Sequence, residues 1–251
     1  MDVSFSNKLI NLDPKEIIKK EKDNSMDNFF LILGLVYNDL KSLGFYTKIL
    51  TDYFTDKIPK KDIENNIPSC NLGEFNGMKT HLERLITSCI HEFLIALQGN
   101  NTLLNTPQFK TLLEKTDKDT KEIWKQLIDL ACGTNLTKKG EEFKKILKNI
   151  RNQGTFHYAG MGPKMKQGYT DYFYDFPIKN DLNKYAYFSD GQTMEKIRYF
   201  YCDAAMQFAL KKDIEDSIKN TEEYYESLLI IMRQINFSIS KLLNKYLENK
   251  K

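Results

Sequence analysis

Apolar residues recur at helical spacing through most of this chain, and this period constrains the fold more than any other feature. From Met78 to Leu97 they stand three or four residues apart, with Gly99 just past the end. Near the C-terminus the steps of three and four alternate strictly, at Tyr225, Leu228, Met232, Ile235, Ile239, Leu242 and Tyr246. Because such spacing puts the apolar side chains on one face of an α-helix, the sequence predicts an all-α fold, a helical bundle.

Further helices are expected before and between these two patterns. Asp13-Pro14 and Thr106-Pro107 each combine a capping side chain with proline at the first helical position. Gly133 is expected to stop a third helix. The expected ranges are 14 to about 23, 26–54, 107–113, 123–131, 143–150 and 193–212.

Residues 58–76 contain Pro59, Pro68 and Gly73 and are predicted to connect two helical parts. On this interpretation residues 1–76 form an N-terminal helical extension with the first core helix, and residues 77–251 form the main helical domain. A chain of 251 residues can also bury its core as one continuous domain, 1–251, and the sequence leaves both divisions open.

Composition narrows the classes of protein to consider. With 41% hydrophobic and 28% charged residues the chain is globular, and a net charge of +3 means that any contact with a polyanion must use a local patch. The four cysteines form no CxxC pair, Cys89 is expected to be a buried thiol, and no signal peptide is evident, so a cytoplasmic location is expected. The most apolar run, Phe29 to Tyr37, is too short to span a membrane.

The stretch from Tyr158 to Asp190 interrupts the helical pattern. It is rich in glycine, proline and aromatic residues and shows no helical period. The sequence predicts a long irregular loop here, with a small hairpin around Tyr172 and Tyr185 as one form that it could take. Connections of this length in a compact domain usually serve a function.

Arg151, Asn152 and His157 stand immediately before that stretch. An arginine fork binds phosphate oxygens in a planar, bidentate way, and an imidazole is well suited to move protons near neutral pH. On an unbroken helix Arg151 and His157 would point roughly 120° apart. Gly154 is therefore expected to interrupt the helix, which would let the two side chains meet at one phosphate.

An arginine with a polar residue right after it, and a histidine five residues further on, resembles the motif of the HEPN superfamily of small helical domains. The resemblance covers this short motif and the helical pattern of the C-terminal half. It implies metal-independent cleavage of single-stranded RNA, with no metal and no cofactor. His157 would transfer the proton, Arg151 would neutralise charge on the phosphoryl oxygens, and Asn152 would orient one of them.

The resemblance also implies partners. HEPN ribonucleases usually build the site from two protomers, so a homodimer is expected, in a toxin or phage-defence setting with an antitoxin or other regulatory protein. RNA contacts are expected from residues of the following stretch: Tyr158, Lys164, Lys166, Tyr169 and Tyr172. In one branch of HEPN toxins the second position after the histidine is a modified tyrosine. Ala159 stands there in this chain, so that regulation is not expected.

Each of these interpretations has an alternative. Arg151 and His157 could pair with a carboxylate and cap a helix, and the aromatic stretch could pack as a lid. The chain would then be a non-catalytic module that binds RNA, a nucleotide or a protein, or a structural subunit whose C-terminal apolar face recruits a partner helix. That face is either core or a dimer interface. His81 and His91 are interpreted as structural, since Ile95 replaces the second histidine of an HExxH motif.

Overall fold

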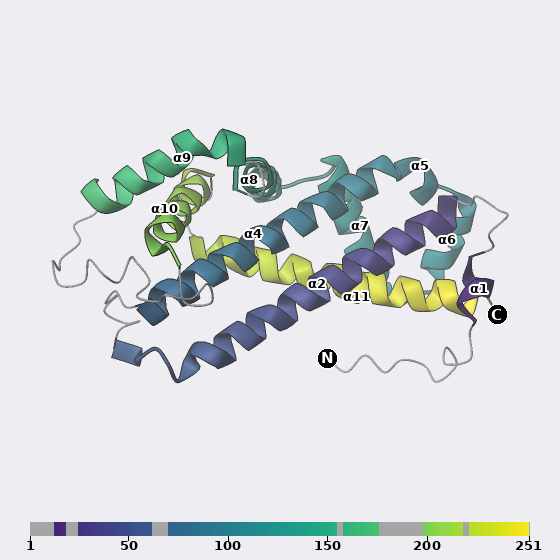
Figure 1. Cartoon of the computed structure of the whole chain (residues 1–251). Helices are drawn as coiled ribbons and strands as arrows, with labels where there is room; N and C mark the ends of the chain where they lie inside the picture. Colours follow the sequence, from purple (N-terminus) through teal and green to yellow (C-terminus); the bar gives the residue numbers. More distant parts are fainter. Residues whose placement is uncertain are drawn as a thin grey trace. The chain divides into compact units, whose positions relative to one another are not determined.

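The structure is a computed structural model that describes residues 13–18, 25–61, 70–154, 158–175, 198–217 and 221–250 (Figure 1). Within these ranges the regular structure is helical and no strand occurs, which confirms the all-α prediction. The helices are α1 (Pro14–Ile17), α2 (Ser25–Thr55), α4 (Cys70–Gly99), α5 (Asn101–Leu104), α6 (Pro107–Glu114), α7 (Lys118–Cys132), α8 (Lys138–Gly154), α9 (Tyr158–Thr170), the π-helical segment η2 (Asp171–Asp175), α10 (Phe200–Ser217) and α11 (Thr221–Glu248).

The chain divides into two compact units that are not sequential. The first comprises Met1–Lys41, Glu92–Thr137 and Leu228–Lys251, and the second comprises Ser42–His91 and Lys138–Ser227. The long helices α2, α4 and α11 contribute residues to both units. Of the helices in the described ranges, none is long and apolar enough to cross a membrane.

Local chemistry explains where several helices begin and end. Asp13 accepts a hydrogen bond from the Lys15 amide at 2.9 Å, and Thr106 accepts one from the Phe109 amide at 3.3 Å. Both prolines occupy first positions, so these two predicted helix starts are confirmed. Gly133 ends α7 in the left-handed region at φ 73°, as its sequence position predicted.

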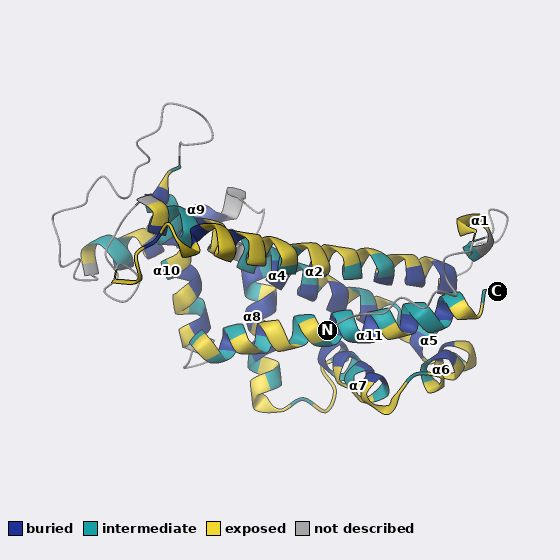
Figure 2. Cartoon of the chain, turned by 90° about the horizontal axis from the view of Figure 1, so that it is seen from below, coloured by how far each residue is buried: buried dark blue, intermediate teal, exposed yellow. Residues whose placement is uncertain are grey.

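Aromatic rings fill the core of the first unit. Trp124 and Phe109 are fully buried with ring centroids 5.8 Å apart, and Phe30 stacks on Tyr246 at 4.1 Å. The Tyr246 hydroxyl donates to the buried Asp27 carboxylate at 2.6 Å. The predicted C-terminal apolar face lies in this core: Leu228, Ile235, Ile239, Leu242 and Tyr246 are all buried within one chain. Figure 2 shows the alternation of buried and exposed positions along α11. This face is therefore core and not a free dimer surface.

In the second unit, helix α4 begins earlier than predicted, so the connection expected over residues 58–76 is shorter. Residues 70–76 belong to α4, whereas the sequence predicted an irregular segment through residue 76. Leu72 is buried in an apolar cluster with Leu50, Phe54 and Ile58. Burial of Leu72 outweighs the poor helix propensity of Gly73, which costs only about 1 kcal/mol. Residues 62–69 lie outside the described ranges. Cys89, expected to be buried, is half-buried and forms no disulfide.

The prediction of an irregular loop from Tyr158 to Asp190 is wrong for residues 158–175. Residues 158–175 form α9 and η2, which pack against α10 (Figure 1). Tyr172 lies in η2 and not in a hairpin, while Tyr185 lies outside the described ranges. Two ion pairs join this segment to α10, Lys164 with Asp213 and Asp171 with Lys212. These tertiary contacts override the low local propensity of glycine and Pro163.

The helix predicted to start at Thr193 is also corrected. In the described residues α10 begins at Phe200, and Arg198 and Tyr199 precede it without helical structure. Residues 193–197 are not described. The Arg198 side chain pairs with Asp203 in the first turn of α10.

Candidate functional site

Arg151 and Asn152 lie in the last turn of α8, directly after the buried Ile150. Arg151 is half-buried, and its Nη1 donates to the Asn152 Oδ1 at 3.1 Å. The described part of α8 reaches Gly154, and residues 155–157 lie outside the described ranges, so the interruption expected at Gly154 stays a prediction. The last carbonyl groups of a helix carry partial negative charge, which favours a cation at this position. His157 lies outside the described residues, so its geometry relative to Arg151 stays a prediction.

The residues expected to contact RNA fall into two groups on α9 and η2. Lys166 and Tyr169 are exposed, and Tyr169 contacts the Phe173 ring at 4.5 Å. Lys164 instead forms an ion pair with Asp213 of α10. The half-buried Tyr172 packs on the α10 residue Phe208, with ring centroids 5.6 Å apart. Tyr158 is the first residue of α9, and its side chain is outside the described part of the structure.

Tyr174 extends the exposed aromatic surface of this region, although no motif in the sequence distinguishes it from the other aromatic residues of the stretch. Its side chain is 77% exposed, and its ring lies 6.5 Å from that of Tyr169. Tyr169 also contacts Tyr201 of α10, 6.4 Å away. Two neighbouring exposed tyrosine rings and the exposed Lys166, one helical turn before Tyr169, are therefore available in this segment.

A second candidate site is a cleft of about 800 Å³ within the same unit. Tyr46, Ile49 and Tyr53 of α2 line one wall. Glu74 and Met78 of α4 contribute to the lining together with His81, Leu82 and Arg198. The buried residues Leu50 and Phe54 also line it, so the cleft rests on the apolar cluster of this unit.

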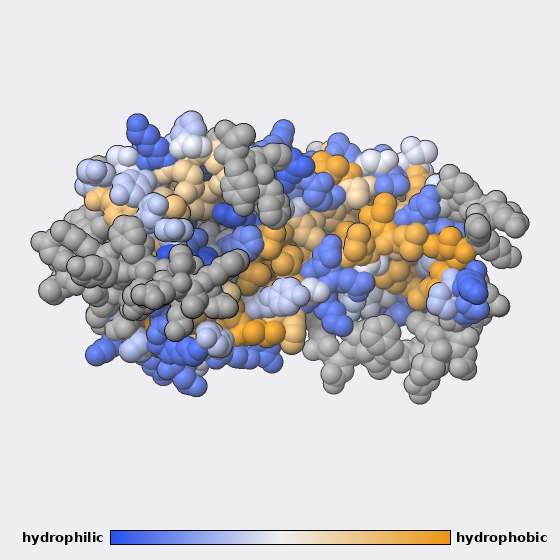
Figure 3. All heavy atoms as spheres, in the orientation of Figure 1, coloured by the Kyte–Doolittle hydropathy of each residue, from blue (hydrophilic) through white to orange (hydrophobic). Residues whose placement is uncertain are grey.

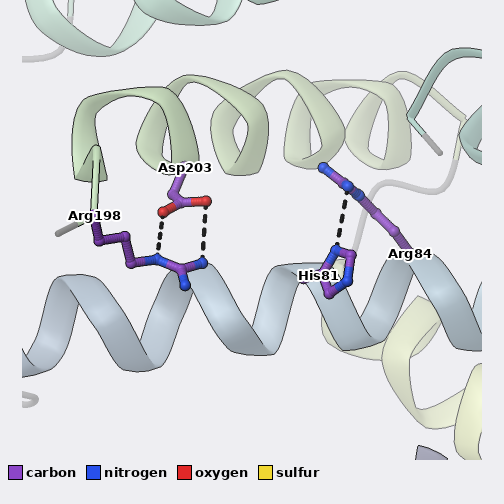
Figure 4. Close-up of polar contacts among 4 residues, drawn as sticks. All are labelled: His81, Arg84, Arg198 and Asp203. Atoms are coloured by element: carbon purple, nitrogen blue, oxygen red, sulfur yellow. Dashed lines mark hydrogen bonds and ion pairs between the residues drawn. The ribbon is translucent and has the colours of Figure 1, made fainter. Parts of the chain in front are cut away.

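Arg198 supplies the fixed charge of the cleft. Its Nε donates to Asp203 Oδ2 at 2.7 Å and its Nη2 to Asp203 Oδ1 at 3.4 Å, so the carboxylate of α10 holds one edge of the guanidinium (Figure 4). Gly77 of α4 makes room for this pair. A Cβ atom there would lie 2.5 Å from Asp203 Oδ2 and 2.6 Å from Arg198 Nη2.

His81 stands one helical turn before Arg84 on α4, and Arg84 Nη2 donates to its Nδ1 at 3.4 Å (Figure 4). Burial lowers the pKa of His81 below its ordinary value of 6.5, and the charges of Arg84 and Arg198 lower it further, against the opposite effect of Asp203. Because a guanidinium can only donate, Nδ1 is the acceptor and Nε2 carries the proton. His81 is therefore a neutral ring that offers one N–H group at neutral pH.

This arrangement predicts that His81 titrates below pH 6.5, as an NMR pH titration of its ring would show. The unfolded chain titrates at the ordinary value of 6.5, so between the two pKa values the unfolded state binds more protons. The contribution of His81 to stability is therefore fully present above about pH 7 and is lost as the pH falls through this window.

Arg84→Gln should move the His81 pKa upward, because it removes a neighbouring positive charge. Arg233→Gln is the matched control: Arg233 is an exposed arginine of the first unit, and its loss should leave the titration unchanged. A His81 pKa at or above 6.5 in the unmodified protein would contradict the assigned environment.

The cleft was missed at the level of sequence, although a signal was available. His81 and Arg84 are three residues apart on a helix and so share a face, and Arg84 and Arg198 are two of only four arginines. In the described ranges no group of three or more His, Cys, Asp or Glu side chains is placed to hold a metal ion. Comparison of the chain with protein-family models, with curated proteins and with solved structures gives no match.

Proposed function

We propose that this protein is a metal-independent endoribonuclease that cleaves single-stranded RNA at Arg151, Asn152 and His157. One observation carries the proposal: the motif spans the junction of two helices. Arg151 and Asn152, joined by a hydrogen bond, lie in the last turn of α8 (Lys138–Gly154), and His157 directly precedes Tyr158, the first residue of α9. A helix junction lets two residues six positions apart approach a common phosphate, which an unbroken helix would prevent.

In the proposed reaction His157 takes the proton of a ribose 2′-hydroxyl, whose oxygen attacks the adjacent phosphorus. The bond from phosphorus to the 5′-oxygen breaks, and that oxygen takes up a proton. The products are a 2′,3′-cyclic phosphate and a 5′-hydroxyl end. Arg151 stabilises the charge that grows on the phosphoryl oxygens. Its bond to Asn152 fixes one nitrogen of the guanidinium and so orients the fork.

RNA would approach along the exposed side of α9 and η2. With a net charge of only +3, binding must rely on a local surface. Lys166 can contact a phosphate there, and the exposed rings of Tyr169 and Tyr174 can stack on bases. The ion pairs of Lys164 and Asp171 with α10 hold this surface in place.

A homodimer that joins two copies of the motif, in a toxin or defence setting with a regulatory partner, belongs to the same proposal and rests on the HEPN resemblance. The buried C-terminal face of α11 is not available for this contact. Light scattering on the active protein tests this part: a monomer at tens of micromolar that still cleaves RNA has no composite site.

The reaction itself is tested by incubating the purified protein with end-labelled single-stranded RNA in EDTA. We expect cleavage to continue and the fragments to carry 2′,3′-cyclic phosphates, because no step requires a metal ion. Loss of activity in EDTA would contradict the proposal. Binding of the RNA without cleavage would instead support a non-catalytic binding module. In that case Arg151, in the last turn of α8 and hydrogen-bonded to Asn152, would only bind the RNA or stabilise the helix end.

A further inference from the structure

The cleft described above has the properties of a small-molecule site and takes no part in the proposed RNA chemistry. Its volume of about 800 Å³ lies in the range of ligand pockets. Tyr46 and Tyr53 on α2 are 54% and 58% exposed, and Ile49 between them is also exposed. Figure 3 shows apolar side chains gathered along the course of α2. Large apolar side chains that face both solvent and a hollow indicate a surface built for a ligand.

The polar end of the cleft can hold one carboxylate. A guanidinium has five N–H groups on two usable edges. Asp203 occupies the edge formed by Nε and Nη2 of Arg198. Nη1 lies on the side of the guanidinium away from Asp203 (Figure 4). The second edge, formed by Nη1 and Nη2, matches a further carboxylate in a bidentate way. His81 adds a neutral N–H donor, since Arg84 holds its Nδ1 as an acceptor.

We propose that this cleft binds a small monocarboxylic acid with a flat, apolar ring system. The carboxylate would lie against Arg198 and His81, and the ring would lie against the side chains of Tyr46, Ile49 and Tyr53.

Charge sets the limit on the ligand's head group. Asp203 already balances the single positive charge of Arg198, and Glu74 also lines the cleft. A doubly charged phosphate group would be repelled strongly by the carboxylates of Asp203 and Glu74. A ligand carboxylate carries one charge, is repelled less, and can share the guanidinium with Asp203. The tyrosines favour a ring as the apolar body, because aromatic rings stack on one another. A rigid ring also loses less conformational entropy on binding than a flexible acyl chain.

Three probes that share an indole ring and differ in charge test the head group: indole-3-propionate, indole-3-propionamide and tryptamine. Isothermal titration calorimetry on the full chain measures their dissociation constants. The carboxylate should bind most tightly, and the amide roughly tenfold or more weakly, because a charge-assisted hydrogen bond is lost. Tryptamine should bind most weakly of the three. Equal affinities, or tightest binding of tryptamine, would overturn the role of Arg198. Absence of binding by every probe up to its solubility would overturn the site.

Variants of residues that are not buried test the location of the site without endangering the fold. Tyr53→Ala should weaken indole-3-propionate binding by about tenfold, since a stacked ring contributes this much. Leu31→Ala is the matched control: Leu31 lies on the same helix with the same 58% exposure and does not line the cleft. Glu74→Gln should strengthen binding by removing a like charge. An unchanged dissociation constant for Tyr53→Ala, or weaker binding by Glu74→Gln, would contradict the proposed placement.

Two further measurements separate the remaining possibilities. Arg198→Lys keeps the charge but loses the fork, so it should weaken the carboxylate more than the amide. Equal effects on both probes would show that Arg198 acts only through its pair with Asp203 and would overturn its role. Decanoate tests the ring itself: tighter binding of this acyl chain than of indole-3-propionate would contradict the preference for a flat ring. RNA cleavage is measured separately, and its outcome does not bear on this site.

Discussion

The His157→Ala protein is expected to cleave RNA about 10²–10⁴-fold more slowly than the unmodified protein, because it lacks the group that transfers the proton. Its affinity for RNA should be nearly unchanged, since the imidazole contributes to the transition state and little to binding. Single-turnover cleavage with the protein in excess measures the first quantity, and binding to an RNA with a 2′-deoxy substitution at the cleaved bond measures the second.

Changes at Arg151 should affect binding and chemistry together. Arg151→Ala should lower both, because the guanidinium contacts the phosphate before and during the reaction. Arg151→Lys should restore part of the binding and little of the rate, since an ammonium group lacks the fork. The effects of His157→Ala and Arg151→Ala should be far from additive, as for groups that act as one unit.

Arg233→Ala serves as the control for the loss of an exposed arginine and should cleave normally. Full cleavage by the His157→Ala protein would point to a different active site. The Arg151–Asn152 pair would then be a structural feature of the end of α8.

The second large effect is expected at Gly168, where α9 packs closely on α10. A Cβ atom at Gly168 would lie 2.2 Å from the Ala205 carbonyl oxygen and 2.9 Å from the Ala209 Cβ. A backbone oxygen cannot rotate away as a long side chain can, so Gly168→Ala must push the two helices apart. Overpacking of this kind typically costs 1–3 kcal/mol of unfolding free energy, occasionally more.

Gly162→Ala is the matched control on the same helix, because a Cβ atom there would meet nothing within 4 Å. Alanine has the better helix propensity, so this variant should be unchanged or more stable by up to about 1 kcal/mol. Urea denaturation followed by circular dichroism measures both. The same stability for the two variants would mean that α9 and α10 do not pack in this way. If RNA binds along α9, Gly168→Ala should also weaken RNA binding, while Gly162→Ala should not.

Much of the helical framework follows from the sequence by itself. The apolar period predicts α2, α4, α7, α8 and α11, because a 3.6-residue repeat is a local property of a helix. Capping is local too: Asp13, Thr106 and Gly133 act on backbone groups within a few residues.

Other features depend on partners that are distant in sequence. The sequence around Gly168 indicates a loop by local propensity, yet Lys164 and Asp171 find counter-charges on α10 and the segment becomes helical. The spacing along α11 predicts an apolar face but not what covers it, and the packing of Phe30 on Tyr246 shows that this face is core.

The cleft is the clearest case of a feature that only the tertiary structure decides. His81 lies on α4, but Arg198, which lines the same cleft, comes from the segment just before α10, and Tyr53 comes from α2. Local propensity and periodicity determine which segments are helices and which of their faces are apolar. Contacts between residues far apart in sequence determine where charges meet, which pKa values shift and where a cavity remains, and no local pattern encodes them.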